Sequence, residues 1–135
     1  MTCPSTKLNP AQSNQIALLE KRLHIYQGFS DIVLKMLQRS YSTMDENEDL
    51  WPFRSLVGLS QFYYSVELYN SLMVNFNEFG ELYAHIDEWR TNEENGADEA
   101  VLRALVRECK TAKTALRKSI TANLDKMRDE IKAIV

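Results

Sequence analysis

Apolar residues recur along the first third of the chain at spacings of three, four and seven positions. The members of this stripe are Ile16, Leu19, Leu23, Tyr26, Val33, Met36 and Leu37. Such periodicity is typical of one face of an α-helix. Asn9 is a good N-cap and Pro10 suits the first helical position, where an amide donor is not needed. The pattern predicts a helix from Pro10 to about Tyr41, preceded by a mobile tail at residues 1–9.

The second predicted helix is rich in aromatic side chains. A polar loop at residues 42–51 precedes it, with Asp49 as the predicted N-cap and Pro52 in the first turn. Its apolar positions are Phe53, Leu56, Val57, Tyr63, Tyr64, Leu68, Leu72 and Phe76. Gly80 is a predicted kink or break, after which residues 81–91 form a further helical segment.

The third predicted helix extends from about Glu99 to Ala133. Gly96 can terminate the preceding helix and Asp98 can cap this one. Its apolar stripe consists of Leu102, Leu105, Cys109, Ala112, Leu116, Ile120, Leu124, Met127, Ile131 and Ile134. Helices of about 35 residues are about 50 Å long, and short loops favour antiparallel neighbours. The sequence predicts an all-α fold: an elongated antiparallel bundle of three long helices, with a fourth segment if the second helix breaks near Gly80.

Composition places the chain among single-domain globular proteins. It has 135 residues, of which 44% are hydrophobic and 26% are charged, and both fractions are ordinary for that class. The longest uncharged stretch, residues 55–66, is too short and too polar to span a bilayer, and no signal-peptide pattern opens the chain. Cys3 and Cys109 make no disulfide framework. We expect a cytoplasmic protein that does not insert into membranes.

Charge is divided unevenly along the chain. Residues 1–44 contain five basic and two acidic side chains, residues 45–94 two and eleven, and residues 95–135 nine and six. An acidic middle helix between two basic helices explains this division. Arg103, Arg107, Lys110 and Arg117 share a helical face that would suit phosphates, but the net charge is −3 and no nucleic-acid-binding motif accompanies them. We therefore expect no nucleic-acid partner.

The sequence offers little catalytic or metal chemistry. A di-iron bundle needs several inward carboxylates and paired Glu-x-x-His motifs. Glu20 and His24, and Glu81 and His85, are separated by four positions instead, and Glu88 adds only one more ligand. Glycine-rich phosphate loops and nucleophile elbows are absent from the sequence. We expect no metal, no cofactor and no enzymatic activity.

The stretch HIYQGF resembles the His-x-x-Lys-Gly core of histidine phosphotransfer domains, which are helical bundles of similar size. His24 and Gly28 match this core, but Gln27 replaces the lysine that would lie near the phosphoryl group. Larger or charged side chains replace the small residues that usually follow; they are Phe29, Asp31 and Ile32. A phosphotransfer domain is the third hypothesis for function.

The aromatic residues of the second predicted helix cover more than one face. Phe62, Tyr69, Phe76 and Tyr83 recur every seven positions, on a stripe rotated away from the first. Trp51, Tyr63 and Phe79 widen the apolar region further, beyond what two neighbouring helices usually cover. Either a fourth helical segment or a second copy of the chain covers these rings, or they remain open to an amphipathic helix of a partner.

A family resemblance favours the open surface. Residues 33–68, VLKMLQRSYSTMDENEDLWPFRSLVGLSQFYYSVEL, resemble the first-to-second-helix passage of flagellar type III export chaperones of the FlgN/FliT group. Residues 102–131 are similar to the long C-terminal helix of that family, including the Ala122–Asn123 pair in its middle. Ser60 departs from the pattern, because a basic residue is common there. The resemblance implies a small cytoplasmic helical bundle that holds an unassembled filament-cap or hook-junction subunit before its export.

The predicted client site combines the aromatic helix with the part of the last helix that has small side chains. Cys109, Ala112 and Ala115 are small, so a groove can form beside them, and Arg107 and Lys110 can contact acidic positions of the client. The predicted partner-binding residues are Tyr69, Phe76, Leu105, Arg107, Cys109, Lys110, Ala112, Leu116 and Ile120. Alternatively, these same residues of the last helix pack against the first helix. For the function as a whole, the alternative is a structural homodimer in which the wide aromatic face is the subunit interface.

The histidine of the phosphotransfer hypothesis gives a direct test. We expect His24→Ala to leave folding and partner binding nearly unchanged, because neither metal nor phosphoryl chemistry is supported around this side chain. Circular dichroism and a binding assay measure both properties. Stable phosphorylation of His24 by a phosphodonor kinase would contradict this expectation.

Overall fold

The computed structural model describes residues 9–134 and contains four α-helices. They are α1 (Pro10–Gln38), α2 (Glu46–Tyr63), α3 (Val66–Glu94) and α4 (Glu99–Lys132), with a short 3₁₀-helix η2 (Tyr41–Thr43) between α1 and α2. No strand occurs among the described residues. The all-α prediction is confirmed, but the helices number four and not three. Of the predicted tail, residues 1–8 lie outside the described residues.

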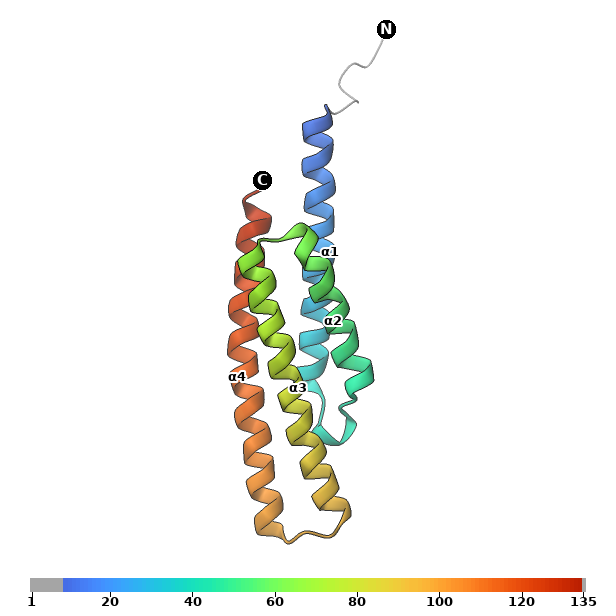
Figure 1. Ribbon diagram of the computed structural model, residues 1–135, viewed down its shortest axis with the longest axis vertical. Helices are drawn as coiled ribbons and strands as arrows, with labels where there is room; N and C mark the ends of the chain where they lie inside the picture. The colour runs from blue at the N-terminus through green and yellow to red at the C-terminus, as the bar shows by residue number, and fades with distance from the viewer. Residues whose placement is uncertain (1–8, 135) are drawn as a thin grey trace.

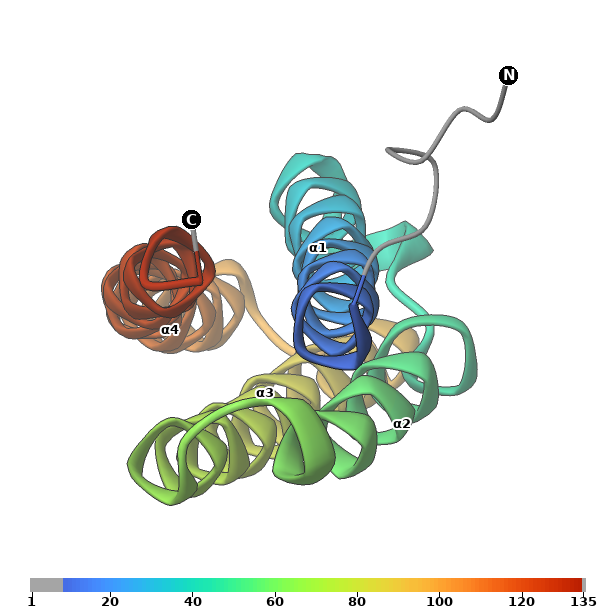
Figure 2. The ribbon, with the colours of Figure 1, turned by 90° about the horizontal axis from the view of Figure 1, so that it is seen from above.

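The chain reverses direction at each connection, so successive helices run along the same long axis in opposite senses (Figure 1). Contacts join α1 to α2, α2 to α3, α3 to α4 and α4 back to α1, and the view from above shows the four helices around a shared interior (Figure 2). The helices are staggered along the axis. The start of α1 extends past the α2–α3 turn, and the α3–α4 hairpin extends past the α1–α2 connection at the opposite end (Figure 1).

The second predicted helix is divided at Tyr64 and Ser65, not at Gly80. Both residues have extended backbone conformations, and the Ser65 hydroxyl accepts a hydrogen bond from the Leu68 amide at 3.2 Å. A side-chain oxygen at this position satisfies one of the free amides at the start of a helix. Gly80, by contrast, lies within the uninterrupted helix α3. The predicted break at Gly80 is wrong because a glycine only weakens a helix, whereas a capped turn ends it.

The start of α2 also differs from the prediction. Asp45 is the N-cap, and its carboxylate accepts a hydrogen bond from the Asn47 amide at 2.8 Å. Asp49 lies one turn inside the helix and is 1% exposed. Its carboxylate accepts hydrogen bonds from the Arg39 guanidinium at 3.1 Å and from the Tyr83 hydroxyl at 2.7 Å. Asp49 is therefore an internal charge with two partners, which a buried carboxylate requires.

Aromatic rings fill the middle of the bundle. Phe53 of α2 packs against Phe29 of α1 and Phe79 of α3, with ring centroids 5.0 Å and 4.7 Å apart. Gly28 permits the close approach of α1 and α2, since a Cβ atom there would lie 2.9 Å from a methyl carbon of Leu56. The aromatic stretch thus contributes one inward row of side chains to the core.

The last helix agrees closely with its prediction. Asp98 accepts a hydrogen bond from the Val101 amide at 3.0 Å, and Gly96 has a φ of 72°, in the region that favours glycine. Against α3, α4 forms a polar layer in which Asn75 donates hydrogen bonds to Ser119 at 2.7 Å and to Glu78 at 3.1 Å. Asn123 completes this layer by donating to the side-chain oxygen of Asn75. Every buried side-chain nitrogen and oxygen among the described residues has a partner.

Removing a central apolar side chain tests the packing of α4. Leu116 is fully buried, so we expect Leu116→Ala to lower the free energy of unfolding by about 2–5 kcal/mol through lost burial and a cavity. Urea denaturation followed by circular dichroism measures this loss. Leu34→Ala is the matched control, because Leu34 is 57% exposed and its truncation should cost less than about 0.5 kcal/mol. Equal losses in the two variants would contradict the packing.

Two buried phenols give the fold a dependence on alkaline pH. Burial raises the pKa of Tyr64 and of Tyr83 above the ordinary value of 10.0, and the hydrogen bond to Asp49 raises that of Tyr83 further. The folded state thus favours the protonated phenols, and this stability is fully present below about pH 10 and lost as pH rises above it. We expect the urea midpoint to fall above pH 10, and to fall less in a Tyr64→Phe/Tyr83→Phe double variant. An equally steep fall in that variant would contradict the assignment.

Candidate functional site

A group of apolar side chains remains exposed where α2 and α3 lie side by side. We define the α2–α3 apolar surface as Trp51, Phe62, Val66, Tyr69, Met73 and Phe76. Trp51, Phe62 and Val66 are 54%, 71% and 70% exposed, and the other three are half-buried against the core. The rings of Trp51 and Phe76 lie 6.5 Å apart and join the two helices. Isolated exposed apolar residues need no explanation, whereas a group of them on adjacent helices is a candidate for an interaction site.

Helical periodicity explains how α2 presents these side chains. Trp51 and Phe62 are eleven positions apart, about three turns, so they share a face. Phe53, Val57 and Ser60 occupy the opposite face and are buried. Helix α2 therefore carries Trp51 and Phe62 on the side opposite to its buried residues.

On α3, the surface follows a stripe that contacts α2 through the Trp51–Phe76 ring pair. Val66, Tyr69, Met73 and Phe76 are separated by steps of three, four and three, which place them along one stripe. The guanidinium of Arg54 lies over the Phe76 ring, 5.8 Å from its centroid. This cation–π contact places a positive charge beside the aromatic part of the surface.

Hydrogen bonds fix the end of this surface at the α2–α3 turn. The Glu130 carboxylate of α4 accepts hydrogen bonds from the Ser65 amide and hydroxyl, both at 2.7 Å. Arg22 of α1 donates to the backbone carbonyls of Tyr63 and Glu130, and the Tyr64 hydroxyl donates to the Arg22 carbonyl at 2.6 Å. Phe62 and Val66 thus project from a turn that two other helices hold in place.

The nine residues predicted to bind a partner do not form one groove. Four of them, Leu105, Cys109, Leu116 and Ile120, belong to the buried interior and are at most 8% exposed. Their predicted role as the frame of an open groove is corrected, because the α4 stripe that contains them packs against the other helices. Burial also raises the pKa of the Cys109 thiol, which reduces its reactivity.

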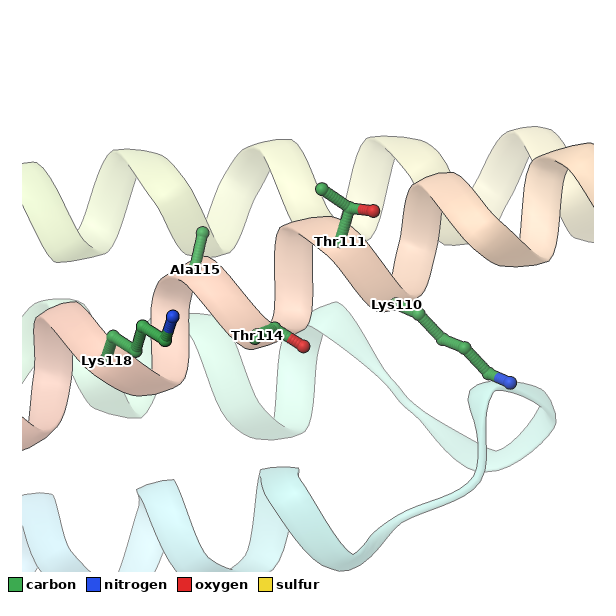
Figure 3. Close-up of a pocket in the computed structure, with 5 residues that line it drawn as sticks. All are labelled: Lys110, Thr111, Thr114, Ala115 and Lys118. Atoms are coloured by element: carbon green, nitrogen blue, oxygen red, sulfur yellow. The ribbon is translucent and has the colours of Figure 1, made fainter.

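The other five predicted residues lie in three places, two of them on neighbouring parts of α4. Tyr69 and Phe76 belong to the α2–α3 apolar surface. Arg107 and Ala112 line a shallow hollow between α3 and α4, together with Glu81, His85, Glu108, Thr111 and Ala115. Lys110 lines a depression formed by residues of α4 alone, together with Thr111, Thr114, Ala115 and Lys118 (Figure 3). Helix α3 separates the aromatic residues from these α4 residues. The predicted site therefore combines residues from two different faces of the bundle.

The predicted site omits four residues of the α2–α3 apolar surface: Trp51, Phe62, Val66 and Met73. The seven-residue spacing of Phe62 and Tyr69 predicts one stripe on one continuous helix. The turn at Tyr64 and Ser65 interrupts that helix and places the two aromatic side chains on different elements. A serine N-cap followed by an apolar run was the local signal that could have located the turn.

The histidine of the phosphotransfer hypothesis is exposed on α1. In the next turn, Gln27 donates a hydrogen bond to the Asp31 carboxylate at 3.1 Å. The neutral amide of Gln27 thus occupies the position where phosphotransfer domains have a lysine to attract the phosphoryl group, and it is paired with a carboxylate.

Neither a membrane-spanning helix nor a known relative points to another site in the described part of the chain. Among the described residues, no helix combines the length and the apolar character needed to cross a membrane. Searches against protein-family models, curated proteins and solved structures find no match to this chain.

Proposed function

We propose that this chain is a non-catalytic, protein-binding helical bundle whose α2–α3 apolar surface receives an amphipathic helix of a client protein. The exposure of Phe62, Val66 and Trp51 on adjacent helices is the observation that carries this proposal. An amphipathic helix binds such surfaces by aligning its own apolar stripe with them. The aromatic side chains supply large contact areas with few rotatable bonds, which favours them at the centres of interfaces.

The charge of this part of the chain indicates which charged residues the client helix would carry. Residues 45–94, which contain α2 and α3, have two basic and eleven acidic side chains. The six residues of the α2–α3 apolar surface are uncharged, and Arg54 lies against one of them, while the acidic excess belongs to other positions in this part of the chain. A client helix with lysines or arginines beside its apolar stripe would match this arrangement, and complementary charge mainly increases the association rate.

The resemblance to the FlgN/FliT group suggests what the client is. Residues 33–68, which carry the resemblance, include the whole of α2 and the first residues of α3, and so contain Trp51, Phe62 and Val66. We therefore propose a cytoplasmic export chaperone that holds an unassembled flagellar or secretion subunit. The described helices expose their largest apolar groups in the segment that carries the resemblance, which is where a client would be held.

A structural homodimer is the second candidate, and the same surface supports it. Two copies could bury their Phe62 and Val66 side chains against each other through a symmetric interface. The two proposals differ in what the protein does alone. A dimer buries the surface at high protein concentration without any client, whereas a chaperone keeps it available.

Truncation of the surface separates client binding from folding. We expect a Trp51→Ala/Phe62→Ala variant to bind an amphipathic client peptide at least tenfold more weakly, equivalent to about 1.4 kcal/mol. Its thermal stability should remain close to that of the unmodified protein, because exposed side chains contribute little to the core. Fluorescence anisotropy with labelled terminal helices of filament-cap and hook-junction subunits measures the affinity.

Leu34→Ala is the matched control, because it shortens an exposed apolar side chain on α1, a helix that contributes no residue to the defined surface. It should leave the affinity unchanged. Light scattering of the protein alone distinguishes the homodimer, which would dissociate in the Trp51→Ala/Phe62→Ala variant. Unaltered peptide affinity in that variant would exclude the α2–α3 apolar surface as the client site.

A further inference from the structure

Three side chains with metal-ligand chemistry meet on the α3–α4 hairpin. Among the described residues, His85 and Glu88 of α3 and Glu108 of α4 each offer one ligand atom within 4.8 Å of the others. The Nδ1 atom of His85 lies 3.7 Å from a carboxylate oxygen of Glu108. The three residues come from two helices, so the group exists only in the folded hairpin.

The helices place these side chains by simple geometry. His85 and Glu88 are three positions apart and therefore share one side of α3. Glu108 belongs to α4, which runs beside α3 in the opposite direction (Figure 1). Zinc binds imidazole nitrogen and carboxylate oxygen at about 2.0–2.2 Å, so the three ligand atoms must move somewhat closer together to bind one ion. Both glutamates are exposed, and rotation of these unrestrained side chains permits that movement.

The surroundings of the group are negatively charged. Glu81, one turn before His85, lines the same hollow as His85 and Glu108, and Arg107 is the one cationic residue in that lining. A negative potential of this kind attracts a cation and disfavours an anion.

We propose that His85, Glu88 and Glu108 bind one divalent transition-metal ion, with zinc as the best fit, and that Glu81 or water completes its coordination. An imidazole together with carboxylates favours zinc over magnesium, which prefers oxygen ligands in a regular octahedron. The ion connects α3 to α4 in the part of the hairpin near the α3–α4 turn. This proposal revises the expectation of no metal, and it is independent of the proposed client surface.

The site has a matched internal control. Glu20 and His24 on α1 have the same four-residue spacing as Glu81 and His85 on α3, but within residues 9–134 they belong to no group of three metal-ligating side chains. His24→Ala removes the other histidine of the chain without changing the proposed site. All variants carry Cys3→Ser and no affinity tag, because thiolates and histidine tags bind zinc themselves.

Isothermal titration calorimetry with zinc chloride tests the proposal. We expect one zinc ion per chain, an affinity at least about tenfold lower in both His85→Ala and Glu108→Gln, and an unchanged affinity in His24→Ala. Because the ion binds the folded state alone, zinc should raise the melting temperature of the protein and of His24→Ala, but not of Glu108→Gln. Circular dichroism without metal establishes that each variant is folded.

Three results would overturn the site. They are unchanged zinc affinity in both His85→Ala and Glu108→Gln, an equal loss in His24→Ala, and magnesium chloride binding with the same affinity as zinc chloride. The last result would identify an unspecific cluster of carboxylates. None of these results bears on the α2–α3 apolar surface, since the site lies on the α4-facing side of α3.

Discussion

The arrangement of the middle helices depends on the hydrogen bonds between the Glu130 carboxylate and Ser65. This carboxylate accepts two hydrogen bonds from Ser65, at the point where the chain leaves α2 and enters α3. Hydrogen bonds to charged groups contribute more than neutral ones, about 1.5–3 kcal/mol each. The two residues are 65 positions apart, so α4 must be in place before this turn is fully satisfied. A helix that could have continued is thereby folded back on itself.

A second polar group holds the other end of α2. Asp49 joins Arg39, at the end of α1, to Tyr83 of α3. Arg90 of α3 donates hydrogen bonds to the carbonyls of Tyr41 and Met44 in the α1–α2 connection. These contacts bury a charge at some cost, but they specify where the connection lies on the bundle. Helix α2 is therefore fixed at both ends, while its outer face carries no helix.

The two proposed sites use opposite sides of α3. Tyr69, Met73 and Phe76 face α2 and belong to an apolar surface that suits a protein client. His85 and Glu88 face α4 and belong to a polar group that suits a metal ion. Because α3 contacts α2 on one side and α4 on another, one helix separates the proposed apolar site from the proposed polar one. Such separation allows each site to be changed without altering the other.

The sequence alone determined the local features of this protein. Asn9, Gly96 and Asp98 mark helix ends through hydrogen bonds and backbone conformations within a few residues, and the helical periodicity required an all-α fold. The tertiary structure decided the rest. The break at Ser65 depends on Glu130, the burial of Asp49 on Arg39 and Tyr83, and the meeting of His85 with Glu108 on the packing of α3 against α4. Spacing along a chain reports only which side chains share a face of one element, whereas these features require groups from different helices to meet.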